Sequence, residues 1–492
     1  MDEFWQDLVS GEIQFRDKWQ FELKSEFFPK STNQASTYTQ EFYIFIPNSL
    51  QINEQVYPKE EFYKDQTNFI RYKTPKFTLS ELMDKKHYGS PLNRLKLMID
   101  TPMLVEDLED ELKLLGNILR SSLRDQILIF LTSANFDIPE IEKFCNEIEE
   151  FRKKFHGIQD KFIKTAKDPK IPMTFRHIDE FISNSIDYFL TGFLKEGRKR
   201  FLPDSADDRI CKIIISEKKH REKIAPISEE KEALLYRNGL LKKFVMDALL
   251  LDTSRSSIQQ KYGHYIGALS AGTAMLIYIL LFVWQGQVFV MNSEPFIILT
   301  VLAYILKDRL KEDLKNISYQ RALRWFSDYT IEIRSPNEKK IIGELRESFT
   351  FVDELSVSEE ILKVRNKEFH TVLAAVKRPE QVMYIKKIVK IFPDKNSLLK
   401  RRRALNVIFR FNIQDFLTKA SDPAHSYTTL DPDTKELLYT ALPKIYHINI
   451  ILRNSFQNDR RERKIEIKKF RIIIDKDGIK SIEQIKTGLM AH

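Results

Sequence analysis

Twenty consecutive residues without a charged side chain run from Tyr265 to Trp284. As an α-helix they measure about 30 Å, the thickness of the hydrocarbon core of a bilayer. Tyr265 and Trp284 stand at the two ends, where amphipathic rings favour the membrane–water interface. Buried helices of soluble proteins seldom stay uncharged for so long. We therefore expect a membrane-spanning helix here, around which the rest of the chain is organised.

A second apolar stretch, Pro295 to Leu306, is only 12 residues long, which is about 18 Å as a helix. In one interpretation Ser293 caps a helix that begins at Glu294, and the short span is met by bilayer thinning or by close packing on the first helix. In the other, the span begins at Val288 and holds Glu294 inside the bilayer, where a carboxylate is a candidate functional group. We favour the first, because a hydrated carboxylate avoids a large desolvation cost. Both give a two-helix transmembrane hairpin over residues 261–306.

The charges that flank the hairpin predict its orientation. The connecting stretch, residues 285–294, contains no Lys or Arg. Basic residues stand on the other side of both spans: Lys242, Lys243, Arg255, Lys261, Lys307, Arg309, Lys311 and Lys315. The positive-inside rule therefore places both termini in the cytoplasm and the short loop outside. We expect a multi-pass protein of a bacterial inner membrane.

Small residues gather in the first half of the first span. Gly267 and Ala271, and likewise Ala268 and Gly272, are pairs four residues apart. Such pairs let two helix backbones approach closely. We expect them to pack against the second helix of the same hairpin, and association between copies of the chain is the alternative.

The rest of the sequence predicts an α+β membrane protein with two large cytoplasmic parts. Hydrophobic residues make up 42% and charged residues 30%, which is typical of globular rather than disordered chains. The expected parts are a β-rich N-terminal segment (1–90) packed on the C-terminal domain, a helical bundle (91–260), the hairpin (261–306), a helical stalk (307–328) and a basic, antiparallel β-rich domain (329–492).

Apolar residues recur at helical spacing through the predicted bundle. From Ile141 to Phe162 they alternate at intervals of three and four, which is typical of a coiled-coil hairpin or a helical bundle. A further helix from Glu229 to Leu251 should lead towards the first span. An apolar stripe from Leu306 to Ile317 predicts that the helix continues beyond the second span. It is either a stalk on the helical domain or an interfacial helix lying on the leaflet, and we favour the stalk because its charges are mixed in sign.

Alternating apolar and polar residues predict the strands of the C-terminal domain, most clearly over residues 407–413. Ile465 and Ile467 are out of phase with Phe470, so we expect a β-bulge near Lys468.

Shorter elements are predicted from local composition. Within residues 13–23 the apolar side chains stand at alternate positions, as on one face of a strand, and Arg16 to Lys18 interrupt this pattern. The stretch therefore indicates one strand or a hairpin. Residues 433–441 indicate a short helix. Asp475 to Gly478 indicate a hairpin turn with glycine at a positive φ angle, rather than a calcium loop.

The net charge of +9 arises in the last quarter of the chain, where residues 371–492 hold 25 Lys and Arg against 13 Asp and Glu. Two basic runs stand out: Lys400, Arg401, Arg402 and Arg403, and Arg460, Arg461, Arg463 and Lys464. For a membrane-tethered domain they indicate anionic lipid or an acidic protein partner. Aromatic residues beside them are sparse, so nucleic acid is not expected.

No familiar catalytic or nucleotide-binding motif is present, and we expect no cofactor and no metal ion. His177 and Asp179 lie two apart in a predicted helix, on different faces, and His156 has no ligand-like neighbour in the sequence. Cys145 and Cys211 are expected to be free thiols. The leading hypothesis is a non-enzymatic membrane anchor or scaffold that acts with a protein partner or as a homo-oligomer. The alternatives are an oligomeric channel or transporter subunit, and a membrane-tethered enzyme with an unfamiliar site.

Overall fold

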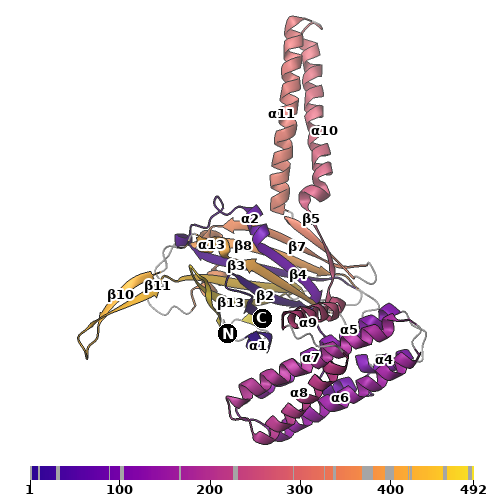
Figure 1. Ribbon diagram of the computed structural model, residues 1–492. Helices are drawn as coiled ribbons and strands as arrows, with labels where there is room; N and C mark the ends of the chain where they lie inside the picture. The colour runs from indigo at the N-terminus through magenta and orange to yellow at the C-terminus, as the bar shows by residue number, and fades with distance from the viewer. Residues whose placement is uncertain are drawn as a thin grey trace.

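The computed structural model describes the chain except residues 1–2, 9–11, 29–33, 88, 100–104, 166–167, 225–230, 292, 326, 336–339, 368–379, 394–403, 419, 421–423, 458–462, 486–489 and 492. It is a mixed α and β protein with antiparallel sheets. A β-sandwich forms the centre, a helical bundle lies at one end, and a helical hairpin projects from the other end (Figure 1).

The larger sheet joins strands from both ends of the sequence. Its strand order is β14 (Gly478–Ile485), β13 (Arg463–Asp475), β12 (Tyr446–Gln457), β3 (Ser36–Pro47), β8 (Glu380–Ile391), β7 (Ile341–Val352), β6 (Tyr329–Arg334) and β5 (Asp252–Ser257), with β15 (Met490–Ala491) also on β13. All neighbours are antiparallel. N-terminal strand β3 therefore lies between two C-terminal strands.

The smaller sheet has the order β1 (Ile13–Phe15), β2 (Gln20–Phe27), β9 (Leu405–Asn412) and β4 (Gln66–Tyr72). Residues 13–23 thus form a hairpin of two strands. The two sheets share one apolar core, in which Phe21 and Phe409 meet Phe42, Ile450 and Phe470. Short helices α2 (Lys59–Asp65), α12 (Glu359–Arg365) and α13 (Gln414–Thr418) pack around the sheets.

Strand β13 changes its buried face without the β-bulge expected near Lys468. Its register with β12 is continuous from Arg463 to Asp475. Ile467 packs with α12 on the outer face of the sheet, whereas Phe470 belongs to the sandwich core. The apolar residues change from one face of the strand to the other because α12 covers the outer face near Ile467, whereas the sandwich core covers the inner face near Phe470. A register irregularity occurs instead opposite β14, between Ile473 and Ile474.

The bundle contains the long helices α5 (Val105–Thr132), α6 (Ile138–Thr165), α7 (Lys170–Arg198), α8 (Asp204–Ile224) and α9 (Lys231–Met246), with α1 (Glu3–Leu8), α3 (Leu79–Met83) and α4 (Pro91–Ile99) against them. The seam of α6 is buried as predicted. However, it packs against several helices, and α5 packs chiefly on α7. A coiled-coil hairpin is therefore not formed, because the apolar faces meet in one multi-helix core.

The hairpin is rooted in the sheet and not in the bundle. Helix α9 ends at Met246, a 3₁₀ turn follows at Asp247–Leu249, and strand β5 intervenes before α10 (Ile258–Val288). Helix α11 (Glu294–Trp325) then leads back to β6, which pairs with β5. The expected helical link from bundle to membrane is thus wrong. Residues 252–257 belong to the sheet because their backbone groups pair with β6.

Residues 433–441 are also not a helix. β10 (Ala424–Leu430) and β11 (Leu437–Pro443) form a two-stranded arm that projects from the body (Figure 1). Asp431 accepts a hydrogen bond from the backbone N–H of Asp433, and Lys435 has a φ of 57°, so the connection is a tight turn. The turn expected before β14 is present: Gly478 has a φ of 140°, and Asp475 accepts hydrogen bonds from the two N–H groups of residues 477 and 478.

Candidate functional site

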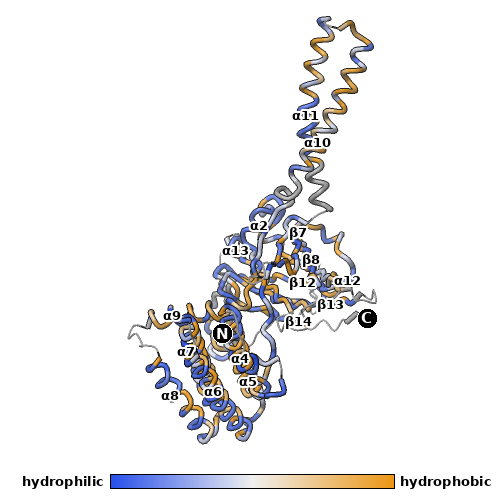
Figure 2. The backbone as a smooth tube through the Cα atoms, turned by 90° about the vertical axis from the view of Figure 1, so that its right-hand side faces the viewer, coloured by the Kyte–Doolittle hydropathy of each residue, from blue (hydrophilic) through white to orange (hydrophobic). Residues whose placement is uncertain are grey.

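Helix α10 is exposed along an apolar surface. Among the described residues, one helical segment is long and apolar enough to cross a membrane, Gly263–Val288, and only 11% of it is buried. A core helix of a soluble protein would be mostly buried, whereas this segment is mostly exposed. Helix α11 does not meet the same criterion, and the expected two-span hairpin therefore rests on the pairing of the helices alone. Figure 2 shows hydrophobic residues on both α10 and α11, mainly in the half of the hairpin that lies farthest from the sandwich.

A polar contact fixes the register of α10 against α11. The buried Gln285 donates hydrogen bonds to the carbonyl oxygen of Phe296, at 2.6 Å, and to Oγ1 of Thr300, at 2.8 Å. Further from the tip, Lys307 lies over the ring of Tyr304, 3.8 Å from its centroid, and 5.9 Å from that of Tyr278 on α10. The charged half of α11 therefore starts level with Tyr278, beside an uncharged part of α10.

The small residues of α10 lie mostly outside the helix–helix contact. Side chains added at Gly267 or Gly272 would meet no atom within 4 Å, Ala268 is exposed and Ala271 is half-buried. The close contact between the two helices includes Ala274, which is buried. Backbone approach at the two glycines thus does not involve α11.

Glu294 is the first residue of α11 and is exposed. The backbone N–H of Ile297 donates to the carbonyl oxygen of Ser293, so the helix begins where the first of the two interpretations places it. A shallow apolar pocket beside Glu294 is lined by Phe289, Pro295 and Leu302 among others.

A polar cluster lies at the root of the hairpin. Asp328, which follows α11, accepts hydrogen bonds from Nζ of Lys59 at 2.8 Å, from the hydroxyl of Tyr63 at 2.9 Å and from the N–H of Phe349 at 2.8 Å. Arg255 of β5 lies over the ring of Tyr329, 3.7 Å from its centroid. These contacts connect the hairpin directly to the sandwich.

Lys387 is fully buried in the sandwich core beside this cluster. Its Nζ lies 2.6 Å from Oδ1 of Asn68 and 3.3 Å from Oε1 of Glu347, and it stands 4.0 Å from the ring centroid of Phe409. Burial lowers the pKa of Lys387 to about 8, and the charge of Glu347 opposes this shift only in part. Because Lys387 and Glu347 are both buried, removing either charge would leave the other unpaired in the core. Neither group is open to a substrate from solvent.

The basic runs fall largely outside the described residues. This holds for Lys400, Arg401, Arg402, Arg403, Arg460 and Arg461, and for the side chain of Arg463. Lys464, at the start of β13, is exposed. Its position is consistent with a contact to a partner or a lipid surface, and that interpretation stays a prediction.

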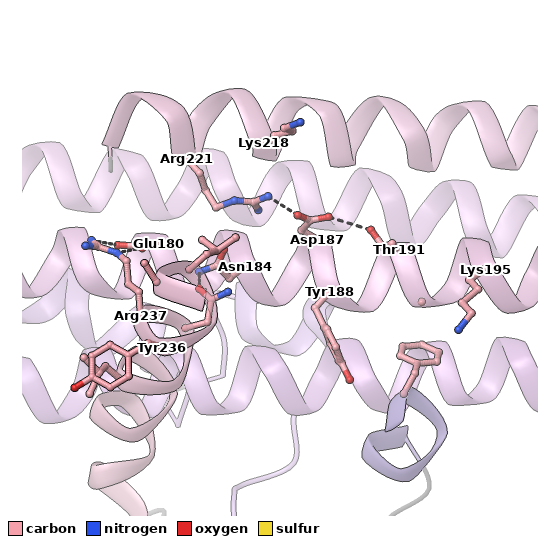
Figure 3. A pocket seen from close by; sticks show the side chains of 16 residues that line it. Glu180, Asn184, Asp187, Tyr188, Thr191, Lys195, Lys218, Arg221, Tyr236 and Arg237 are labelled. Atoms are coloured by element: carbon pink, nitrogen blue, oxygen red, sulfur yellow. Dashed lines mark hydrogen bonds and ion pairs between the residues drawn. The ribbon is translucent and has the colours of Figure 1, made fainter. Parts of the chain in front are cut away.

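A cavity among the described residues lies in the helical bundle and not in the β-domain, where an enzyme site was considered. It has a volume of about 810 Å³ and lies between α1, α7, α8 and α9. Figure 3 shows its carboxylates held by arginines: Arg237 binds Glu180 through two hydrogen bonds of 2.5 and 2.7 Å, and Arg221 pairs with Asp187. Paired in this way, neither carboxylate resembles a poised acid or base.

Three side chains that are far apart in the sequence meet between α6, α7 and α8. Nε2 of His156 lies 3.4 Å from Oδ1 of Asp179, and Nε2 of His220 lies 2.9 Å from Oδ2. Arg152 donates to Asp179 at 2.6 Å and to Glu217 at 3.0 Å. Burial alone would raise the pKa of Asp179, but these hydrogen bonds and the charge of Arg152 hold it well below its usual value.

His156 has no ligand-like neighbour in the sequence, but the structure brings Asp179 and His220 to it from other helices. Cys145 and Cys211 are free thiols, as expected. Comparison of the chain with known protein families, with curated proteins and with solved structures finds no match.

Proposed function

We propose that this chain is a membrane anchor and scaffold, whose hairpin enters a bilayer and whose sandwich and bundle stay on one side of it. The single observation that carries the proposal is the long, uncharged and exposed surface of α10 on a hairpin that projects away from both folded parts (Figure 1). Burial of such a surface in lipid removes it from water without any change in the body.

The root of the hairpin supports a topology with both ends on the same side. Ser257 and Tyr329, the last residue before α10 and the first of β6, are partners in one antiparallel ladder. The chain therefore leaves and re-enters the sandwich at one point. Together with the basic residues at the root and the absence of Lys and Arg from the connecting stretch, this favours two spans with a cytoplasmic body and the tip outside.

The two helices differ in length of apolar surface, and this constrains the anchor. From Pro295 to Leu306 is about 18 Å of helix, which is shorter than the hydrocarbon core of about 30 Å. Two complete spans thus require a locally thinned bilayer or a polar neighbour that shelters the charged part of α11.

The arm formed by β10 and β11 supports the scaffold part of the proposal. Its side chains include exposed Tyr427, Leu437 and Tyr439. An isolated two-stranded hairpin is marginally stable in water, so a bound protein would stabilise it. The arm lies away from the membrane hairpin and is open to a cytoplasmic partner (Figure 1).

Accessibility of the tip tests the topology. A Ser293→Cys variant, made with Cys211→Ser, is expected to react with a membrane-impermeant maleimide in intact cells, because the tip of a two-span hairpin reaches the outer water. Ser205→Cys, an exposed position at the start of α8, serves as the matched control and should react only after permeabilisation. Protection of Ser293→Cys under both conditions would place the tip inside the bilayer and contradict two spans.

A second candidate, the subunit of an oligomeric channel, is favoured by the contrast between the helices beyond Lys307. There α11 is charged while the adjacent part of α10 is apolar. An oligomer with α10 towards lipid and α11 towards a water-filled centre accommodates both surfaces. Ion flux through liposomes that is lost in Glu294→Gln is the expected result, and a purified oligomer without flux would rule this candidate out.

A further inference from the structure

We propose that His156, Asp179 and His220 bind a divalent transition-metal ion of the zinc class, with a water molecule in the fourth position. The site lies in the helical bundle, and it is independent of the membrane proposal. Its coordinating atoms come from three helices, α6, α7 and α8, so the ion would link these helices to one another.

The spacing of the ligand atoms fits such an ion. The coordinating atoms of the three side chains all lie within 4.8 Å of one another. Tetrahedral zinc with bonds of about 2.0–2.2 Å requires ligand atoms roughly 3.3 Å apart. Nε2 of His220 lies 2.9 Å from Oδ2 of Asp179, which is close to this value, and Nε2 of His156 lies 3.4 Å from the other oxygen of the same carboxylate, Oδ1.

The ligand types select the class of metal. Two imidazoles with a carboxylate suit zinc and its neighbours, whereas calcium and magnesium prefer sites made of oxygen alone. Binding requires neutral imidazoles that present Nε2 to the ion. Both rings are partly open to solvent, with exposed side-chain fractions of 37% for His156 and 26% for His220, which gives an ion a way in.

Glu217 supplies a second observation that points to a cation. One of its oxygens is held by Arg152, and the other, Oε2, is buried without a hydrogen-bond partner among the described residues. Glu217 precedes His220 by one helical turn on α8, and Arg152 links it to Asp179, so its negative charge lies next to the three ligands. Buried unsatisfied oxygens are rare because each costs free energy, and a cation bound at the three ligands would offset the negative charge of this carboxylate.

Arg152 would act as a positioning residue. It donates to Oδ1 of Asp179 and to Oε1 of Glu217, and it leaves Oδ2 of Asp179 beside Nε2 of His220. Two carboxylates and one guanidinium give a net charge of −1 with neutral histidines, which favours a divalent cation. A purely structural network, in which the two imidazole N–H groups donate to Asp179, is the competing interpretation.

Cobalt(II) provides a direct probe of the site. The full chain is purified in detergent without a histidine tag, dialysed against a chelator and titrated with Co²⁺. We expect one equivalent to bind with the visible absorption of a four-coordinate site, and equimolar Zn²⁺ to displace it. His220→Gln should abolish the band. His177→Gln, on the same helix as Asp179 but packed on Phe244, should keep it.

Two further variants guard against misfolding as the cause of lost binding. His156→Gln, at the more exposed ring, should also remove the band while the circular dichroism spectrum stays unchanged. Arg152→Lys should weaken affinity by about 10–100-fold, as is usual for residues that orient ligands. No cobalt band in the wild-type chain, or a band of wild-type strength in both His220→Gln and His156→Gln, would overturn the proposal and leave the structural network.

Discussion

A chain in which a short Asn-Gly-Gly linker replaces residues 258–327 is expected to leave the membrane fraction and to remain folded. The deletion is permitted by the fold, because Ser257 and Tyr329 are already opposite one another in a ladder and a short glycine-containing loop can join them. Asp328 is retained because it binds Lys59 and Tyr63. Sedimentation after carbonate extraction measures the first expectation, and circular dichroism with thermal unfolding measures the second.

The expected loss of attachment follows from the apolar side chains removed. The stretch from Tyr265 to Trp284 contains nine Leu, Ile, Phe and Val residues. At about 0.3–0.6 kcal/mol for each residue in a membrane helix, they contribute roughly 3–5 kcal/mol to insertion. Without them no described surface of similar length remains. If the deleted chain stayed in the membrane fraction, attachment would have to occur through the body.

Point substitutions separate lipid contact from any effect of the deletion on folding. Leu276 and Leu280 are exposed on α10, with exposed fractions of 61% and 62%. In water their replacement by Arg is harmless, but inside a bilayer each Arg costs about 2.5–3.5 kcal/mol. Leu276→Arg with Leu280→Arg should therefore reduce attachment strongly. Leu97→Arg with Leu235→Arg, at leucines 66% and 72% exposed in the bundle, is the matched control and should have no effect.

The elements that the sequence predicts well are those whose pattern has one cause. The helices of the bundle follow from apolar residues that repeat at 3.6-residue spacing, and strand β9 from alternation between a core face and an open face. The long uncharged stretch likewise predicts the helix α10 correctly, because its apolar residues follow from one property, an apolar surface that is exposed rather than packed on the body.

Elements that depend on distant partners could not be predicted in this way. Strand β5 has the sequence Asp-Thr-Ser-Arg-Ser-Ser, without an apolar face, and it exists because β6 offers its backbone groups at the sheet edge. Strand β13 has apolar residues on both parities because α12 covers part of its outer face. Residues 433–441 have local helical character, which pairing with β10 overrides.

The same limit applies to candidate sites. His156, Asp179 and His220 are 23 and 41 residues apart, and only the packing of three helices brings them together. Their spacing along the chain therefore carries no signal. The prediction could have been improved by asking which polar residues interrupt the apolar faces of α6, α7 and α8, since a buried polar side chain requires partners.

Replacing Lys387 by Met is expected to destabilise the sandwich by about 3–5 kcal/mol, since it leaves a buried charge without its partner. Glu347 is only 1% exposed, and its Oε2 already lacks a hydrogen-bond partner among the described residues. With the ammonium group gone, only Gln66 and Asn68 still donate to it. For a domain of this size the loss corresponds to a Tm decrease on the order of 10 °C. Thermal unfolding of the hairpin-deleted chain measures this without detergent.

The double variant Lys387→Met with Glu347→Gln identifies the cause. It should regain most of the lost stability, because no unpaired charge remains; equal instability of the single and double variants would show that lost packing is responsible.

The pH dependence of stability gives an independent check. Burial holds the pKa of Lys387 at about 8 in the folded chain, against an ordinary value of 10.5. Between these values the unfolded chain binds more protons, so the stability of the wild type must rise with pH. Between pH 7.5 and 9.5, its Tm should therefore increase relative to that of the double variant, and a constant difference would contradict a buried, charged Lys387.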